Sequence, residues 1–451
     1  MTQGNSMKLI FQFFLPILIG NLFQQLYSFV DSMVVGKGIG DVALAAVGNT
    51  SSVHFLILGF AMGLTGGLGI CISHSFGAND IEKLRKEIAM SVYICLAIGI
   101  VITVGSLFWM RRLFVFLQTP EDMMTDTLVY FGTILAGSTV TIFNNFAMTL
   151  LRSVGNSKVP LASMIVSSVV NIVLDLLFVF PFGMGVFGAA LATVLAQVVS
   201  ALYCLVYIRR AAELLPRKTD WRADGVLLGA LVGKGLPVAV MNSVTAVGGM
   251  VLQVFVNQMG TAYVAAYAAC MKVCGLFEQP GITLGLALLT FTGQNYGAGK
   301  YDRIKQGVRA GVVLSVLVNV PFAALEIFCP KLLASLMLND ATVISYTCIF
   351  LPVRPWRAVC LPKRLPGNGK NSSADGVRDC GGCHARHGCT AFSTAPCVPR
   401  SGIRRNFRLG RSWSYAYDYL LFLSEAALRE NSRCERIKGE VIYKNPVCTA
   451  L

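Results

Sequence analysis

Two aspartates stand inside long apolar stretches of the chain, where a carboxyl group is energetically costly and usually serves a function. Asp31 falls in the stretch 8–36 and Asp175 in the stretch 159–181. Two carboxyls that share a desolvated pocket cannot both ionise readily, so such a pair can take up and release a proton. The chemistry indicated is proton or cation binding inside a membrane.

The depths of these residues along their helices allow them to meet. At a rise of about 1.5 Å per residue, Asp31 lies about 35 Å along its helix and Asp175 about 24 Å along another that enters from the same face. Asn171 precedes Asp175 by one turn on the same helix face, and Thr193 lies about 12 Å from the outer end of its own helix. We therefore expect these four residues to form one site. The alternatives are that Asp31 caps its helix in water and that Asp175 has a structural hydrogen-bond role.

The elements that position this site are apolar stretches long enough, at about 20 residues, to cross a bilayer as helices. They span 8–36, 42–74, 86–110, 124–151, 159–181, 185–208, 230–258, 262–293 and 307–329, with the start of a tenth at 337–352. Only 14% of the residues are charged and 55% are hydrophobic, whereas about 25% are charged in soluble domains. Disorder, collagen and a disulfide scaffold are excluded, and an all-α polytopic membrane protein is predicted.

Basic residues concentrate in every second break between the predicted helices, with five Lys and Arg between residues 209 and 222. The alternate breaks are poorer in Lys and Arg. Because positively charged loops stay in the cytoplasm, the N-terminus and the even-numbered breaks are predicted to be cytoplasmic. The first apolar stretch is too long for a cleavable signal peptide and is expected to be the first span.

An internal repeat relates the two halves of the apolar region. Pro16 recurs as Pro237, and "SFGANDIEKLRK" from Ser75 recurs as "NYGAGKYDRIKQ" from Asn295, at offsets of 220–221 residues. Six predicted helices separate the copies, so both enter the membrane with the same polarity. This predicts two six-helix lobes related by an axis along the membrane normal, with the substrate path between them.

Four segments together resemble the bacterial multidrug and toxic compound extrusion (MATE) family, over residues 8 to about 350. They are "LPILIGNLFQQLYSFVDSMVVGKGIGDVALAAVG" (15–48), "LLRSVGNSKVPL" (150–161), "NIVLDLLFVFPFGMGVFGAALATVLAQ" (171–197) and "FTGQNYGAGKYDRI" (291–304). The resemblance implies alternating-access export of amphipathic, often cationic, drugs, with H⁺ or Na⁺ as the coupling ion and no other cofactor. It also implies a monomer in the bacterial inner membrane whose partners are drugs and lipid, not nucleic acid.

The family's N-lobe cation site matches Asp31, Asn171, Asp175 and Thr193. Its proline in the first helix matches Pro16, which stands 15 residues before the acid. A proline at this position removes a backbone hydrogen bond and permits a kink. Pro16 is therefore either a hinge that bends on protonation or the site of a static kink.

The second lobe departs from the family pattern. Part of the family has a glutamate ligand in the first helix of this lobe, where this chain reads "PVAVMNSVTAVGG", with Asn242 and no acid. Lys272, Glu278 and Glu326 are the remaining candidates, although mutual neutralisation or a loop-edge position also explains them. This pattern favours the N-lobe site over a sodium site in the second lobe.

Two other classes of function stay open. A lipid-linked oligosaccharide flippase of the same superfamily shares the architecture, but it should have a broad cationic cavity, and few Lys or Arg lie within these spans. A membrane-tethered haem or metal redox protein requires a functional C-terminal segment.

Residues 353–451 differ in kind from the rest, with 17 Lys and Arg against 7 Asp and Glu, and with seven of the 14 cysteines. The motif "CGGCH", with Cys380, Cys383 and His384, has the form of a c-type haem attachment site and of zinc ligands. A metal site is disfavoured, because a repeat protein would lose half of one lobe to gain it.

A shift of reading frame after about residue 352 explains the change better. Read one base forward, "LPKRLPGNGKNSSADGVRD" can become "YRNAFQGMGKTPLPMASGI", which resembles "LLRSVGNSKVPLASMI" at the equivalent point of the first copy. We expect an N-lobe over 1–222, an incomplete C-lobe over 223–352, and a basic, Cys-rich tail over 353–451 that is out of frame and disordered.

Overall fold

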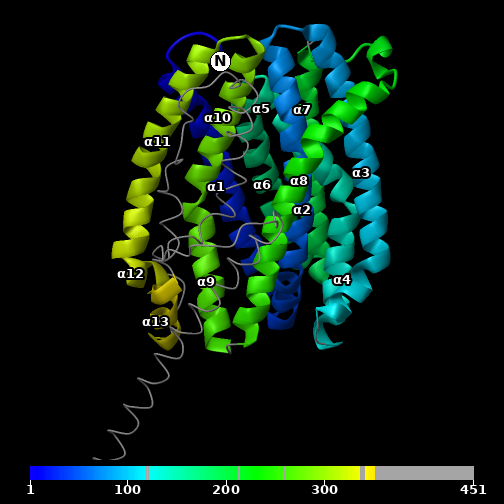
Figure 1. The fold of residues 1–451 in the computed structure, drawn as a ribbon. Helices are drawn as coiled ribbons and strands as arrows, with labels where there is room; N and C mark the ends of the chain where they lie inside the picture. Colours follow the sequence, from blue (N-terminus) through cyan, green and yellow to red (C-terminus); the bar gives the residue numbers. More distant parts are fainter. Residues whose placement is uncertain (118, 120, 212–213, 259–260, 336–340, 351–451) are drawn as a thin grey trace, which may run out of the picture. The chain divides into compact units, whose positions relative to one another are not determined.

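The computed structural model describes residues 1–117, 119, 121–211, 214–258, 261–335 and 341–350. They all lie in one structural unit of the chain, Met1–Ala385. Every regular element in these ranges is a helix (Figure 1). The expectations for the tail over 353–451, including those for Cys380, Cys383 and His384, lie outside the described residues.

The helices follow the apolar stretches closely. They are α1 (Ser6–Gly38), α2 (Asp41–Gly77), α3 (Ile81–Phe116), α4 (Glu121–Ala136), α5 (Ser138–Ser153), α6 (Lys158–Val179), α7 (Gly185–Arg210), the 3₁₀ turn η1 (Lys218–Trp221), α8 (Gly225–Gln258), α9 (Thr261–Phe277), α10 (Gln279–Gly297), α11 (Tyr301–Phe328), α12 (Pro330–Ser335) and α13 (Ala341–Phe350). In the described ranges, eight helical segments are long and apolar enough to cross a membrane, or nine if α4 and α5 form one bent span. The predicted all-α polytopic membrane protein is confirmed.

Two predicted spans are broken, which the apolar pattern does not show. The stretch 124–151 bends by 47° between α4 and α5. The break is at Gly137, where an added Cβ would lie 2.5 Å from the side chain of Val194 on α7, so the missing side chain allows close packing. The stretch 262–293 breaks between α9 and α10, where Pro280 stands in the first turn of α10. Proline has no N–H to continue a helix but is well suited to start one.

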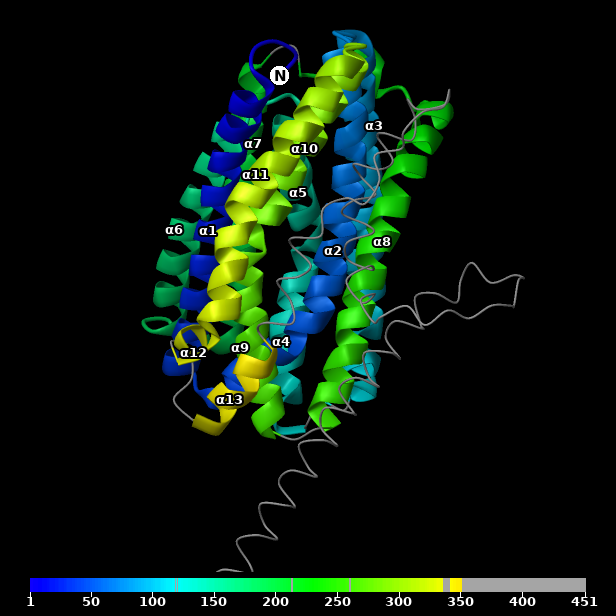
Figure 2. The ribbon, with the colours of Figure 1, turned by 60° about the vertical axis from the view of Figure 1, so that its left-hand side comes forward.

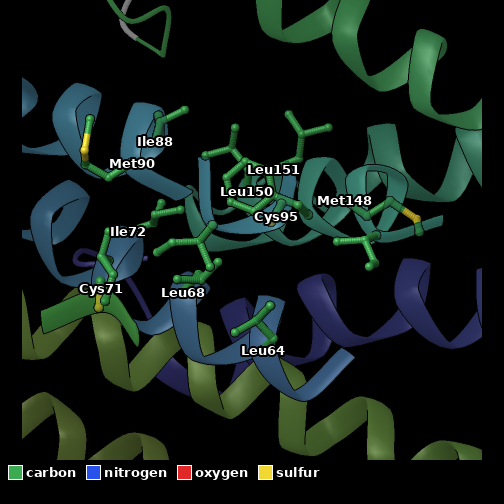
Figure 3. Close-up of a cluster of buried hydrophobic side chains, with 14 of the residues drawn as sticks. Leu64, Leu68, Cys71, Ile72, Ile88, Met90, Cys95, Met148, Leu150 and Leu151 are labelled. Atoms are coloured by element: carbon green, nitrogen blue, oxygen red, sulfur yellow. The ribbon is translucent and has the colours of Figure 1, made fainter. Parts of the chain in front are cut away.

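The largest apolar cluster joins α2, α3 and α5, and Figure 3 shows part of it. Leu64 and Leu68 of α2 pack in it together with Leu231 and Ala239 of α8. Small residues bring α2 and α8 together, since a Cβ on Gly67 would lie 2.5 Å from the Cα of Gly235. Lipid is as apolar as these side chains, so close packing of this kind holds membrane helices together. The first helix of the C-lobe is thereby packed on the N-lobe.

One end of the helices, which we call the N-terminal face, contains the start of α1 and the ends of α2 and α10 (top of Figures 1 and 2). Polar contacts join distant parts of the chain there. Gln294 donates to the carbonyl of Ser153 at 2.8 Å, and Arg303 donates to the carbonyl of Gly4 at 2.9 Å. The N-lobe and C-lobe are therefore tied together at this face.

The two repeat copies make a reciprocal contact at the N-terminal face. A Cβ on Gly77 would lie 2.0 Å from the carbonyl oxygen of Gln294, and one on Gly297 would lie 1.9 Å from that of His74. Gly77 and Gly297 are 220 residues apart, and so are His74 and Gln294. Each glycine therefore packs against the residue that corresponds, in the other copy of the repeat, to the one its partner contacts. No side chain fits at either glycine.

Replacing Gly77 or Gly297 by alanine is expected to loosen the N-terminal face. A methyl group forced into a packed contact costs about 1–3 kcal/mol, which corresponds to a shift of about 5–150-fold in a local opening equilibrium. Amide hydrogen exchange of residues 74–80 and 294–300 should rise accordingly. Gly48→Ala is the matched control in α2, because nothing lies within 4 Å of its added Cβ. Unchanged exchange in both variants would contradict the contact.

Candidate functional site

Polar residues follow one face of each of three N-lobe helices that pack on one another, α1, α6 and α7. In each set, the second residue follows the first by three or four positions and the third follows the first by seven. This spacing places all three on one side of a helix. The sets are Gln24, Tyr27 and Asp31 on α1, Ser168, Asn171 and Asp175 on α6, and Thr193, Gln197 and Ser200 on α7. Because α1 and α7 both pack on α6, these polar faces meet inside the N-lobe.

Asp31 and Asp175 lie together, as the depth argument predicts. Asp31 is 9% exposed and Asp175 is fully buried, and their carboxyl groups lie close enough to interact directly. Oδ1 of Asp31 and both carboxyl oxygens of Asp175 have no hydrogen-bond partner in the described part of the chain. Two unpaired negative charges cannot be held at such a place, so the pair requires a proton or a cation.

Asn171 and Thr193 complete the predicted set of four. The amide of Asn171 donates to Oγ1 of Thr193 at 3.4 Å, and the Thr193 hydroxyl donates to the carbonyl of Ala189 at 3.2 Å. Oδ1 of Asn171 is buried and accepts no hydrogen bond from any described residue. The site therefore offers oxygen atoms that a bound proton, water or small cation can satisfy.

A cavity of about 20 Å³ adjoins these residues. It is lined by Gln24, Tyr27, Asn144, Met148, Met164, Ser167, Ser168, Asn171, Thr193, Ala196, Gln197 and Ser200. This volume holds one water molecule, and a buried water needs two to four polar partners. Oδ1 of Asn144 and Oγ of Ser200 are buried without a partner among the residues described, and they can supply two.

Several residues of this site were not predicted. Gln24 and Tyr27 share the helix face of Asp31, and Gln197 shares that of Thr193, so their spacing alone could have identified them. Asn144 donates to Oε1 of Gln197 at 2.7 Å. Tyr130 of α4 packs near the site, against the apolar cluster that includes Val34 and Val35 of α1. No pattern in its own stretch indicates this, because only tertiary packing brings α4 to the site.

Pro16 lies half-buried in α1, which continues through it from Ser6 to Gly38. Its role as a hinge stays a prediction, because one conformation does not distinguish a hinge from a fixed kink.

The weaker candidates of the C-lobe are placed differently from the N-lobe set. Asn242 donates across the lobes to the carbonyl of Gly59 at 3.1 Å. Lys272 of α9 is exposed, and so is Glu278, which stands between α9 and α10. The second acid, Glu326 of α11, is 5% exposed. Within the described ranges, no group of three or more His, Cys, Asp or Glu residues could hold a metal ion.

The contact of Asn242 has a counterpart in the other copy of the repeat. Asn21, which follows Pro16 as Asn242 follows Pro237, donates to Oγ1 of Thr283 at 3.0 Å. Each asparagine thus joins the first helix of one lobe to the other lobe. Asn242 therefore forms a hydrogen bond between the lobes, a role that the sequence did not predict.

Comparison with known proteins yields one family and several relatives. The MatE family model matches residues 16–177 and 237–369. The chain is 30% identical over 355 residues, 76% of each chain, to the probable multidrug resistance protein YoeA of Bacillus subtilis (strain 168). It is 23% identical over 353 residues, 78% of each chain, to the multidrug export protein MepA of Staphylococcus saprophyticus.

Solved structures show the same fold. One is a MOP superfamily transporter from Pyrococcus furiosus, with a TM-score of 0.77 at 24% identity, covering 87% of this chain and 86% of that one. Another is an outward-facing multidrug resistance MATE family transporter, with a TM-score of 0.77 at 24% identity and 86% of each chain covered.

Proposed function

The chain belongs to the MatE family of membrane transporters, and on that premise we propose that it exports small-molecule drugs in exchange for protons bound by Asp31 and Asp175. Multidrug efflux is supported by the family match and by the names of the curated relatives. The chain is accordingly a transporter and not an enzyme. Those names indicate drugs as the substrates, and the family resemblance implies amphipathic ones.

The observation that carries the coupling proposal is the buried pair of carboxyls with unpartnered oxygens. One proton shared between them lowers the charge of the pair from two negative charges to one, and its release to water restores the second charge. If the two states of the pair favour different arrangements of the lobes, proton binding and drug binding are linked through that equilibrium. Asn171 lies one turn from Asp175 on α6 and is joined to Thr193 by a hydrogen bond, so both residues offer polar atoms near the pair.

The C-lobe offers no equivalent pair in its first helix. The sequence of α8 contains no Asp or Glu. The side-chain amide of Asn242 donates a hydrogen bond to the carbonyl of Gly59. This supports the N-lobe as the coupling site.

We also infer that the N-terminal face is cytoplasmic. The basic residues of the loops and helix ends at this face include Lys83, Lys158, Arg209 and Lys300. Such a concentration of basic residues is typical of cytoplasmic loops. The protein is thus proposed to be a multi-pass protein of the bacterial inner membrane with a cytoplasmic N-terminus.

Transport by alternating access needs two lobes that close on each other, and we propose that the second lobe is incomplete in this chain. Transport experiments therefore use the chain with the reading frame restored after about residue 352.

The coupling ion is tested in proteoliposomes loaded with a cationic dye. An imposed proton gradient should drive dye export at equal sodium on both sides, and a protonophore should stop it. Export driven by a sodium gradient at equal pH would instead make sodium the coupling ion of the same site. Export that follows neither gradient would contradict ion coupling.

A further inference from the structure

A further carboxyl group is buried far from the proposed coupling pair. Glu87 lies six residues after the start of α3, about 9 Å from the N-terminal face, and is 4% exposed. Its Oε2 has no hydrogen-bond partner in the described ranges, and the same holds for Oγ of Ser75, Oγ of Ser91 and Nε2 of His74. The polar atoms around Glu87 therefore have unused hydrogen-bonding capacity.

The charges that act on Glu87 come from three places. Lys83 precedes it by one turn on α3, Lys234 comes from α8, and Asp80 stands just before α3. Neither lysine forms an ion pair with Glu87 in the part of the chain described. On α2 the neighbouring titratable groups are Cys71 and His74. Ser75 of α2 also neighbours the carboxyl. Glu87 thus lacks only the ion-pair partner that normally accompanies a buried charge.

The second copy of the repeat is an internal control for this position. At the offset of 220 residues, Glu87 corresponds to Gly307 and His74 to Gln294. Gly307 lies against the ring of Phe291, since an added Cβ would be 2.2 Å from it. The side-chain amide of Gln294 donates a hydrogen bond to the carbonyl of Ser153. The equivalent positions of the C-lobe therefore pack without a carboxyl or an imidazole. Packing alone does not require Glu87 and His74 in the N-lobe.

Groups of the C-lobe cover Glu87 and its neighbours. Leu231 of α8 packs in the same apolar cluster as Leu84 and Ile88, the latter next to Glu87 in the chain and labelled in Figure 3. The ring of His74 lies 4.8 Å from that of Tyr296. Parting of the lobes at the N-terminal face would remove these groups and admit water to Glu87.

We propose that Glu87 is a second proton-binding site, separate from Asp31 and Asp175, whose protonation favours closure of the N-terminal face. A buried carboxyl without an ion-pair partner is tolerated when neutral, and it is tolerated as an anion once water reaches it. Closure therefore favours uptake of a proton from the water at this face, and opening favours its release. By linkage, protonation favours closure to the same extent.

The proposal is tested in the full chain in lipid nanodiscs, with Asp31→Asn and Asp175→Asn already present. Because Asp31 and Asp175 cannot titrate in this background, the result for Glu87 does not depend on whether the coupling proposal is right. Infrared difference spectra between low and high pH should show loss of protonated carboxyls, including a buried one, and Glu87→Gln should remove the component of the buried carboxyl. His74→Gln, which introduces the residue of the second copy, should leave it in place.

Hydrogen exchange of residues 72–80 and 292–300, corrected for intrinsic chemical exchange, reports closure in the same samples. Protection should fall by about 5–150-fold as the pH is raised through the titration. In Glu87→Gln it should stay high at all pH values, and Glu87→Asp should restore the pH dependence. The same pH dependence in Glu87→Gln as in its parent, or a buried-carboxyl component that Glu87→Gln does not change, would overturn the proposal.

Discussion

The chain as it stands is expected to give no drug tolerance to a sensitive bacterium, and the chain with its reading frame restored after about residue 352 is expected to give it. Residues 353–451 contain no apolar run of the ~18 residues that a membrane span needs. The longest, "YLLFLSEAAL" from Tyr419, is about half a span. Without further spans, the second lobe would lack the partners on which its helices pack.

The measurement is the drug concentration that stops growth, at matched amounts of membrane-inserted protein. The control is the restored chain carrying Asp175→Asn, which shares the complete second lobe but lacks the titrating group. Resequencing the DNA that encodes residues 345–375 checks the same point independently. Tolerance conferred by the chain as it stands would show that the frame account is wrong and that residues 353–451 have a role in transport.

In the restored chain, Asp175→Asn is expected to reduce proton-driven efflux to the level of empty liposomes while the protein still inserts. Asparagine keeps the shape of aspartate and its hydrogen bonding but cannot change charge. Asp31→Asn should act in the same way, because the two carboxyls share one site.

The matched control for this pair is Asp302→Asn, the same chemical change at a side chain that is 92% exposed and pairs with Lys305 at the surface. A surface ion pair of this kind contributes about 0–1 kcal/mol, so efflux should be unaffected. Undiminished efflux in Asp175→Asn would refute the assignment of the coupling site.

Much of the helical fold could be predicted from the sequence, because a membrane span must be continuous, apolar and about 20 residues long. The breaks could not. α4 ends just before Gly137, which packs closely against Val194 of α7, a neighbour that is remote in the sequence. Pro280 was visible, but prolines inside membrane helices are common, as Pro16 within α1 shows.

The site could be predicted at positions where a charged residue stands in an apolar stretch of the sequence. Asp31 and Asp175 stand out as acids in apolar stretches, whereas Tyr130 resembles an ordinary aromatic of a membrane helix. Glu87 was missed for the opposite reason. It follows "DIEKLRK", a charged segment that indicates a solvated helix start, and only the packing of α2 and α8 shows that it is buried.

The central claim, that drug binding and the Asp31–Asp175 proton are linked, is tested most directly by proton release. A cationic drug is added to the purified restored chain in weakly buffered solution, and the pH is recorded. The account predicts release of protons on drug binding, and none when Asp31→Asn and Asp175→Asn are both present although the drug still binds. Equal proton release from the parent chain and from the double variant would contradict it.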